Sequence, residues 1–184
     1  MGNKEKNIVE AAIRTVSRYG VRRTTMSDIA SEAGVSRQTL YASYSCKEQI
    51  MTACLRHMAD EKHATIQCEW KNVTTLSEKL DIFFQYCVVE PFNMLKAMPD
   101  SEDLYSGFNA AAMAELERAN QEKKGLLETL FSDAAIAGQK VSTSDLAEMT
   151  VRASGSFKYE VGDEEHLKRL LDALKTSVLA ALKP

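Results

Sequence analysis

The sequence predicts an all-α protein made of a small N-terminal module and a larger helical body. Apolar residues make up 45% of the 184 residues and charged residues 27%, ordinary values for a globular chain, while 8 glycines and 3 prolines leave little material for turns. Apolar positions recur at steps of three and four residues along most of the chain, and no segment has the alternation of a strand. The length suits one domain or two small ones.

The first two helices are indicated by an apolar stripe and by capping residues. Apolar side chains over residues 8–19 form one helical face that ends at Gly20, a residue type common just after a helix C-terminus. Thr25 followed by Asp28 has the spacing of a capping box, with Asp in the acidic position. We therefore expect a second, short helix that stops at Gly34.

Two further helix starts follow within the next fifteen residues. Ser36 can cap a third helix that runs through Tyr44, and Ser45 with Glu48 three residues later forms another capping box. The sequence thus signals four helix starts in its first fifty residues.

Residues 26–41 carry the spacing of a helix-turn-helix. Ala30 is small where two helices would cross, Gly34 can take the left-handed turn conformation, and Val35 and Leu40 are apolar plugs beneath the second helix. Four side chains remain at the exposed start of that helix, the part that meets base edges in a major groove: Arg37, Gln38, Thr39 and Tyr41. Arg and Gln can form bidentate bonds to guanine and adenine, and a Thr methyl can pack on that of thymine.

The charge is distributed unevenly along the chain. Residues 1–50 carry eight Lys and Arg against five Asp and Glu, a net charge of +3, and the remainder carries 15 against 21, a net charge of −6. This asymmetry indicates a small basic module joined to an acidic body. Because phosphate contacts supply most non-specific DNA affinity, a module of only +3 should act in paired copies.

The stretch from Ile8 to Ile50 resembles the DNA-binding domain of TetR-family transcriptional regulators. The matching residues are Ala11, Ala12, Gly20, Thr24, Thr25, Ile29, Ala30, Ala33, Gly34, Val35, Ser36, Leu40, Tyr41, Lys47 and Glu48. The resemblance implies a helix-turn-helix DNA-binding domain of three helices over residues 1–48 and a helical ligand-binding and dimerisation domain over residues 49–184. The expected protein is a repressor that binds double-stranded DNA as a homodimer on a near-palindromic operator.

The same resemblance implies that Thr25 and Lys47 hold phosphates at helix N-termini, where free N–H groups favour anions. With Ser36 they complete the predicted DNA-binding set of Thr25, Ser36, Arg37, Gln38, Thr39, Tyr41 and Lys47. The sequence departs from the family where Ala42 and Ser43 replace two bulky or aromatic residues and Tyr44 replaces a Phe. We expect Tyr44 to take the core role of that Phe, with its hydroxyl at the surface.

The remaining residues indicate a helical body. Helices are expected over residues 47–70, from Thr75 onward, over 104–118, 121–137, 144–161 and 163–182, with a break bracketed by Pro91 and Pro99. In the resembled family the last two helices pair with those of a second subunit. The side chains assigned to that interface are Gly155, Leu167, Leu171, Leu174 and Val178. Burial against the chain's own core is the alternative explanation of this apolar stripe.

The resemblance also implies a pocket in the body for a small apolar or amphipathic effector, whose binding releases DNA. The predicted lining is Phe84, Tyr105, Phe108 and Met113, with Gln85 and Asn109 as polar orienting groups. Helical bundles need the same residue types to fill their cores, so core packing stays open for each of them. An alternative is a body that binds a protein partner instead of a small ligand.

Other classes of function lack sequence support. The chain has three histidines, no G-x-S-x-G and no phosphate-binding Gly-rich loop, so we do not expect an enzyme or a cofactor. Cys54 and His57 stand three residues apart, but buried Cys and packed His explain this spacing equally, and no metal site is predicted. No charge-free stretch is long enough to span a membrane and no secretory signal is evident, so we expect a cytoplasmic protein.

Overall fold

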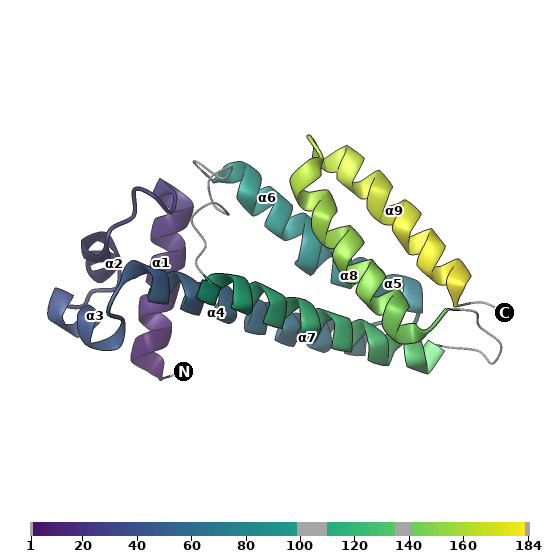
Figure 1. Cartoon of the computed structure of the whole chain (residues 1–184), viewed down its shortest axis with the longest axis horizontal. Coiled ribbons are helices and arrows are strands. Elements are labelled where there is room, and N and C mark those ends of the chain that lie inside the picture. The colour runs from purple at the N-terminus through teal and green to yellow at the C-terminus, as the bar shows by residue number, and fades with distance from the viewer. Residues whose placement is uncertain (1, 99–109, 135–140, 183–184) are drawn as a thin grey trace. The chain divides into compact units, whose positions relative to one another are not determined.

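The computed structural model describes residues 2–98, 110–134 and 141–182, and every regular secondary-structure element within these residues is a helix (Figure 1). The elements are α1 (Asn3–Tyr19), α2 (Met26–Glu32), α3 (Arg37–Ser43), α4 (Lys47–Glu69), the 3-10 helix η1 (Trp70–Asn72), α5 (Leu76–Phe84), the π-helix η2 (Gln85–Val89), α6 (Glu90–Ala97), α7 (Ala110–Ala134), α8 (Thr143–Glu160) and α9 (Glu164–Ala181). The all-α prediction is confirmed.

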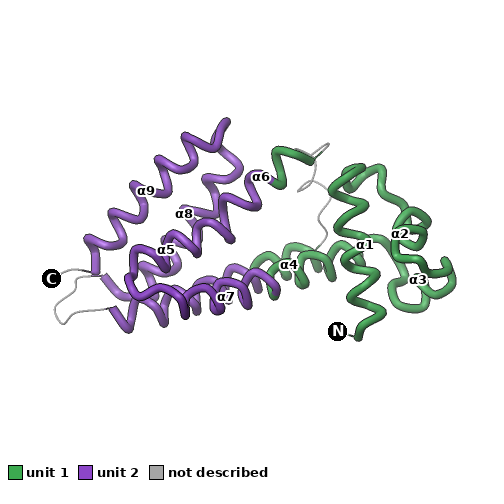
Figure 2. Tube along the Cα trace, turned by 180° about the vertical axis from the view of Figure 1, so that it is seen from behind, with its two compact units in different colours: residues 1–60, 94–117 green, residues 61–93, 118–184 purple. Residues whose placement is uncertain are grey.

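The chain divides into two compact units (Figure 2). Unit 1 comprises residues 1–60 and 94–117, and unit 2 comprises residues 61–93 and 118–184. The helix α4 contributes residues 47–60 to unit 1 and residues 61–69 to unit 2, and the domain boundary expected after residue 48 stays a prediction.

The predicted turn signals of unit 1 are present in the structure. The helix α1 ends at Tyr19, and Gly20 follows it with φ of 81°, a conformation that L side chains rarely adopt. Gly34 has φ of 65° in the turn between α2 and α3. At the start of α2 the Thr25 hydroxyl accepts a hydrogen bond from the Asp28 N–H at 3.2 Å, and the Asp28 carboxylate accepts one from the Thr25 N–H at 2.8 Å. This capping box is as predicted.

The predicted capping box at the start of α4 is wrong. The helix begins at Lys47, and the Ser45 N–H donates to the side-chain carbonyl of Gln49 at 2.8 Å instead of meeting Glu48. Gln49, one residue beyond Glu48, thus takes the place of the predicted acidic partner. The prediction of a fourth helix start is confirmed although its cap is different.

The core of unit 1 is small and close-packed. Buried apolar residues from α1, α2, α3 and α4 form it: Ile8, Val9, Ala11, Ala12, Ile29, Ala30, Ala33, Leu40, Ile50 and Cys54. Tyr44 packs partly buried against this cluster, in the core role expected of it. The four alanines allow the helices to approach closely, and Leu40 is fully buried beneath α3.

Unit 2 has a larger core built on α5, η2, α8 and α9. It contains Phe83, Phe84, Phe92 and Phe131 with aliphatic side chains from every helix of the unit. The capping box that opens α5 repeats the predicted pattern, since the Thr75 hydroxyl accepts from the Glu78 N–H at 3.2 Å. Within the described residues no helix is long and apolar enough to cross a membrane.

Two predicted helix boundaries in the body are wrong. Pro91 does not break the chain, because α5, η2 and α6 follow one another directly and the π-helical turn before Pro91 replaces the α-helical hydrogen bonding that a proline cannot join. The expected separate helices over residues 104–118 and 121–137 are one helix, α7, over the described part, because no Gly or Pro interrupts residues 110–124. Pro99, residues 104–109 and residues 135–137 lie outside the described residues.

Candidate nucleic-acid interface

The helix α3 presents polar side chains to solvent on one face and is fixed to the core of unit 1 by Leu40 on the other. Arg37 and Gln38 are exposed, and 46% of Tyr41 is accessible, whereas Leu40 between them is fully buried. Ser36 caps the helix by accepting a hydrogen bond from the Thr39 N–H at 3.1 Å. The Ser36 and Thr39 hydroxyls also lie 2.9 Å apart. The arrangement leaves a rigid, exposed N-terminal end of α3 that can enter a groove of DNA.

The two predicted phosphate ligands both have partners within the chain. Lys47 donates to the carbonyl oxygens of Val21 at 3.0 Å and Thr24 at 3.1 Å, so it fixes the loop between α1 and α2. One of its three donors remains for another acceptor. Thr25 is occupied by Asp28, whose pKa is lowered by these hydrogen bonds, so the residue stays anionic. A phosphate at this helix start must therefore be placed beside a carboxylate.

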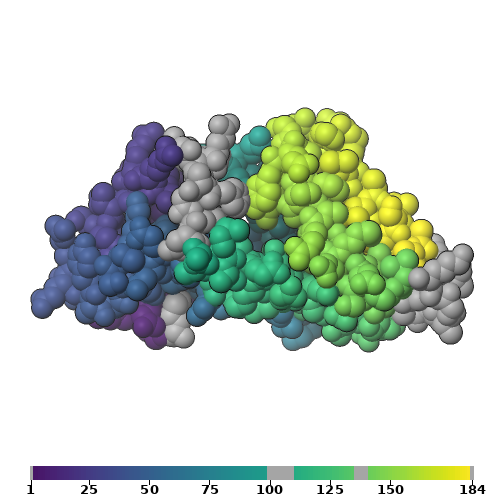
Figure 3. Space-filling view, viewed as in Figure 1, coloured from purple at the N-terminus to yellow at the C-terminus, as the bar shows by residue number. Residues whose placement is uncertain are grey.

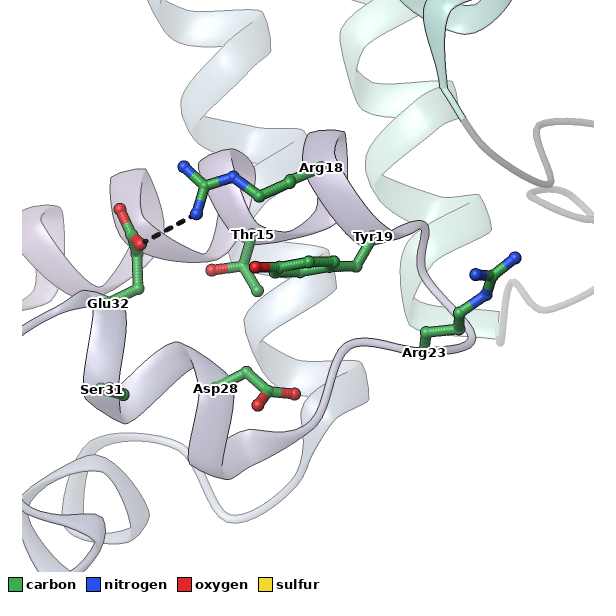
Figure 4. A pocket seen from close by; sticks show the side chains of 7 residues that line it. All are labelled: Thr15, Arg18, Tyr19, Arg23, Asp28, Ser31 and Glu32. Atoms are coloured by element: carbon green, nitrogen blue, oxygen red, sulfur yellow. Dashed lines mark ion pairs between the residues drawn. The ribbon is translucent and has the colours of Figure 1, made fainter.

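A pocket of about 360 Å³ lies between the C-terminal end of α1 and α2 in unit 1 (Figure 4). Its lining is Thr15, Arg18, Tyr19, Arg23, Asp28, Ser31 and Glu32. Arg18 and Glu32 form an ion pair across it with 3.8 Å between Nη1 and Oε2. Arg14 also donates to Glu32, at 2.8 Å, and lowers the pKa of that carboxyl. The charges of this pocket balance one another, so it is not selective for an anion or a cation.

Three of the six predicted effector contacts lie within the described residues. Phe84 is only 3% exposed and belongs to the core of unit 2, whereas Gln85 is exposed to solvent, and their contact with an effector stays a prediction. Met113 is 53% exposed. The other three predicted contacts, Tyr105, Phe108 and Asn109, lie outside the described residues. The sequence pattern could not separate core from lining because both use large apolar side chains.

The predicted interface leucines are inside the subunit. Leu167, Leu171, Leu174 and Val178 belong to the core of unit 2, and Leu167 and Val178 are fully buried. Their side chains are therefore packed within the subunit, as the alternative explanation of the stripe expected, and a role at a dimer interface stays a prediction. Gly155 on α8 is partly exposed, and a Cβ there would meet nothing within 4 Å.

The outer face of α9 instead carries a row of small exposed side chains. Ala173, Thr176, Ser177 and Ala180 recur there at steps of three and four residues. The neighbouring helix α8 exposes Met149 to 48% and Tyr159 to 48%. Figure 3 shows α8 and α9 side by side on one face of unit 2.

The cysteines are free thiols in the structure. Burial raises the pKa of the Cys54 thiol to about 12, and its Sγ donates to the Val9 carbonyl oxygen at 3.7 Å. A metal ligand must be a thiolate, so Cys54 does not suit that role.

Three basic residues of unit 2 were not singled out by the sequence pattern. Lys62 on α4, Lys123 on α7 and Lys158 on α8 are partly buried and interact electrostatically around Cys87. The three lie on different helices, 61 and 35 residues apart, so no local spacing brings them together.

Comparison with known proteins agrees with the fold. Residues 8–54 match the family model described as bacterial regulatory proteins, tetR family. Over 55 residues the chain is 38% identical to the HTH-type transcriptional regulator BetI of Agrobacterium fabrum, a match covering 30% of this chain and 27% of that one. A probable acrEF/envCD operon repressor of Escherichia coli K12 is 32% identical over 47% of this chain and 41% of its own length. The matches thus span less than half of these relatives.

Solved structures share the fold over nearly the whole chain. The fatty acid degradation regulator FadR of Bacillus halodurans has a TM-score of 0.70 at 19% identity and is covered to 98%. A putative transcriptional regulator of Saccharomonospora viridis, solved in complex with choline, has a TM-score of 0.73 at 17% identity, with 95% of each chain covered. Residues 8–54 are thus similar to the tetR family of bacterial regulatory proteins, and the solved structures share the fold of the chain.

Proposed function

We propose that the protein is a transcriptional repressor that binds a near-palindromic operator as a homodimer and releases it when a small effector binds unit 2. The observation that carries the DNA-binding part is the geometry of α3. Its exposed Arg37, Gln38 and Tyr41 project from a helix whose buried side, at Leu40, is fixed in the core. Arg22 and Arg23 are exposed in the loop before α2 and add positive charge to the same unit.

In the proposed DNA complex, Arg37 and Gln38 read base edges while Ser36, Thr39, Tyr41, Thr25 and Lys47 contact the backbone or neighbouring bases. The free N–H groups at the start of α3 favour a phosphate. Lys47 contributes through the donor that Val21 and Thr24 leave unused. Its second effect is to hold the loop in front of α2 in position.

Dimerisation is proposed through the outer faces of α8 and α9, not through the buried leucines. The small residues Ala173, Ser177 and Ala180 would let two copies of α9 approach closely, and Gly155 would do the same on α8. Two-fold symmetry then places the two α3 helices one DNA turn, about 34–36 Å, or a multiple of it apart. Sedimentation at about 1 µM protein tests this part, and a monomer of 20.5 kDa would contradict it.

Selection of bound fragments from the source genome tests the DNA-binding part. We expect the selected fragments to share a near-palindromic element with two half-sites, because the protein binds as a symmetric pair. Fragments without a common sequence, or with a single asymmetric half-site, would contradict the proposed docking. The position of the element relative to a promoter then distinguishes repression from activation.

A further inference from the structure

Three lysines of unit 2 gather around one buried thiol. Lys62, Lys123 and Lys158 interact electrostatically with each other and with Cys87 of η2. We call these three residues the lysine cluster. They come from α4, α7 and α8, so the cluster depends on the fold of the unit.

The lysine cluster lacks a compensating carboxylate among the described residues. No Asp or Glu of the described segments lies within 4.0 Å of these three ammonium groups. Glu90 influences Lys62 and Cys87 from a longer distance. The contacts present are weaker ones, from Lys123 Nζ to the Asn120 side-chain oxygen at 3.4 Å and from Lys158 Nζ to the Tyr159 ring centroid at 4.9 Å. Among the described residues, the three lysines of the cluster thus have Glu90 as their longer-range carboxylate neighbour.

Other lysines of unit 2 show that the absence of a nearby carboxylate is not a general property of its surface. Lys175 has a side chain only 20% exposed and forms an ion pair with Asp81 at 2.6 Å. Lys124 is 22% exposed and pairs with Glu148 at 2.9 Å. Unit 2 therefore places a carboxylate within ion-pair distance of these two partly buried lysines, but not of the lysine cluster.

The environment works against the charges of the cluster. Burial and, to a smaller extent, the neighbouring Lys123 and Lys62 lower the pKa of Lys158 to about 7, while Cys87 acts in the opposite direction. Burial also lowers the pKa of Lys62. A bound anion would favour the charged forms of Lys62 and Lys158, since an opposite charge raises the pKa of an ammonium group.

The cluster does not serve to activate Cys87. Burial raises the pKa of this thiol, and that effect outweighs the three lysines, which act to lower it. The thiol therefore stays protonated, and a reactive thiolate is not the product of this arrangement. The charges remain available for another partner.

We propose that the lysine cluster binds the anionic head group of a small amphipathic effector, a carboxylate or a phosphate. The assignment rests on the proposed function, because it names the effector class for unit 2. The apolar part of the ligand is expected beside η2, the element that carries Cys87, whose Val88 and Val89 are buried in the core of unit 2. A π-helix such as η2 is a common feature of functional sites.

The test compares probes that share an octyl chain but differ in head-group charge. Octanoate, octanol and octyltrimethylammonium are titrated into the full chain by calorimetry, with inorganic phosphate as a fourth probe. We expect an anion to bind at least about tenfold more tightly than the neutral and cationic probes, the effect of one or two charge-assisted hydrogen bonds. Octanoate binding alone assigns a carboxylate head group, and phosphate binding alone assigns a phosphate.

Variants locate the site. Lys158→Met and Lys123→Met should each weaken anion binding about tenfold or more, while the matched control Lys168→Met, an exposed lysine of α9, should leave it unchanged. Lys62→Met provides a third variant if either of the others fails to fold by circular dichroism. Equal binding of all octyl probes, absence of binding by both anions, or anion binding that these substitutions do not change would each overturn the proposal.

The pH dependence adds a second readout. Anion affinity should fall as the pH rises through the pKa of Lys158, with Lys62, Lys123, Cys87 and Glu90 as the other ionisable groups around it. An affinity that is flat between pH 6 and 8.5 would count against the assignment. Operator binding without any probe is measured in parallel. Loss of anion binding with intact operator binding refutes only this inference, whereas failure to bind DNA refutes the proposed function.

Discussion

The two units use their basic side chains in opposite ways. In unit 1, Arg37 extends into solvent from α3, and the loop before α2 adds further exposed positive charge. In unit 2, Lys123 and Lys158 are drawn partly out of water beside a buried thiol. Exposed cations suit the long, repetitive phosphate backbone of DNA, and partly buried ones suit a single small anion. The location of a positive charge therefore says more about its partner than the net charge does.

The hydrophobic cores of the two units also differ, in size and in the side chains that fill them. Unit 1 packs α1, α2, α3 and the start of α4 around small and aliphatic side chains, and the buried Leu40 fixes α3 on this core. Unit 2 packs long helices around phenylalanines and carries a π-helix inside the bundle. Substitutions in unit 1 and in unit 2 should therefore differ in their effect on operator binding, and the following variants test that difference.

The largest expected effect is the loss of a core leucine. Leu40→Ala and Leu127→Ala each remove a fully buried side chain, one from each unit, and should each cost about 2–5 kcal/mol of unfolding free energy. Leu40→Ala should also abolish operator binding, because it removes the anchor of α3, whereas folded Leu127→Ala should retain it. Chemical denaturation and operator titration measure both effects. Equal operator affinity for the two variants would contradict the distinction between the units.

The matched caps of the two units give a smaller effect. Thr25→Ala and Thr75→Ala remove hydroxyls that accept from N–H groups at the same distance, 3.2 Å, and each should cost about 0.5–2 kcal/mol of stability. Only Thr25→Ala should weaken operator binding, because of the two capped helices α2 and α5 only α2 approaches a phosphate in the proposed complex. If Thr75→Ala weakened it as much, the DNA effect of Thr25 would reflect stability alone.

Lys47→Ala should act on DNA binding independently of sequence. Removal of its ammonium loses one proposed phosphate contact, so the slope of log affinity against log salt should fall by about 1 on operator and non-operator DNA alike. Lys168→Ala is the surface control. The two carbonyl bonds of Lys47 add a loss of stability, which thermal unfolding separates from the salt slope. An unchanged slope would assign Lys47 to holding the loop only.

The last expected effect is a pH dependence of the free energy of unfolding of unit 2. The pKa of Lys158 is lowered to about 7 in the folded chain, so above pH 7 the unfolded chain binds more protons than the folded one. Stability contributed at this site is therefore lowest below pH 7 and rises as the pH increases toward the ordinary pKa of lysine. Lys158→Met should remove this rise while Lys168→Met keeps it. Unfolding curves at pH 6.5 and 8.5 measure the difference, and identical wild-type and Lys158→Met profiles would contradict it.

The sequence predicted unit 1 more accurately than unit 2. In unit 1 the determinants are local: Gly20 and Gly34 need positive φ, and Thr25 with Asp28 forms a cap within one turn. These signals are read directly from neighbouring residues. The cap at Ser45 was missed because Gln49, one position beyond the expected partner, competes for the same N–H.

The features of unit 2 depend on distant residues. The stripe on α9 predicted an apolar contact correctly, but only the packed structure shows that Leu167 and Val178 meet their own core. The continuity of α5, η2 and α6 through Pro91 needed the π-helix, which has no sequence signature of its own. The lysine cluster is assembled from three helices, so no motif announces it.

The most direct test of the account is a comparison of Arg37→Ala with Arg169→Ala on the selected operator. Both arginines are exposed, but Arg37 lies on α3 in unit 1 and Arg169 on α9 in unit 2, paired with Glu165 at 3.0 Å. The account predicts that Arg37→Ala loses about 1–3 kcal/mol of binding free energy and tolerates another base at one position per half-site. Arg169→Ala should bind as the wild type does. Equal affinities and unchanged base preference for both variants would contradict the assignment of α3 as the DNA-reading helix.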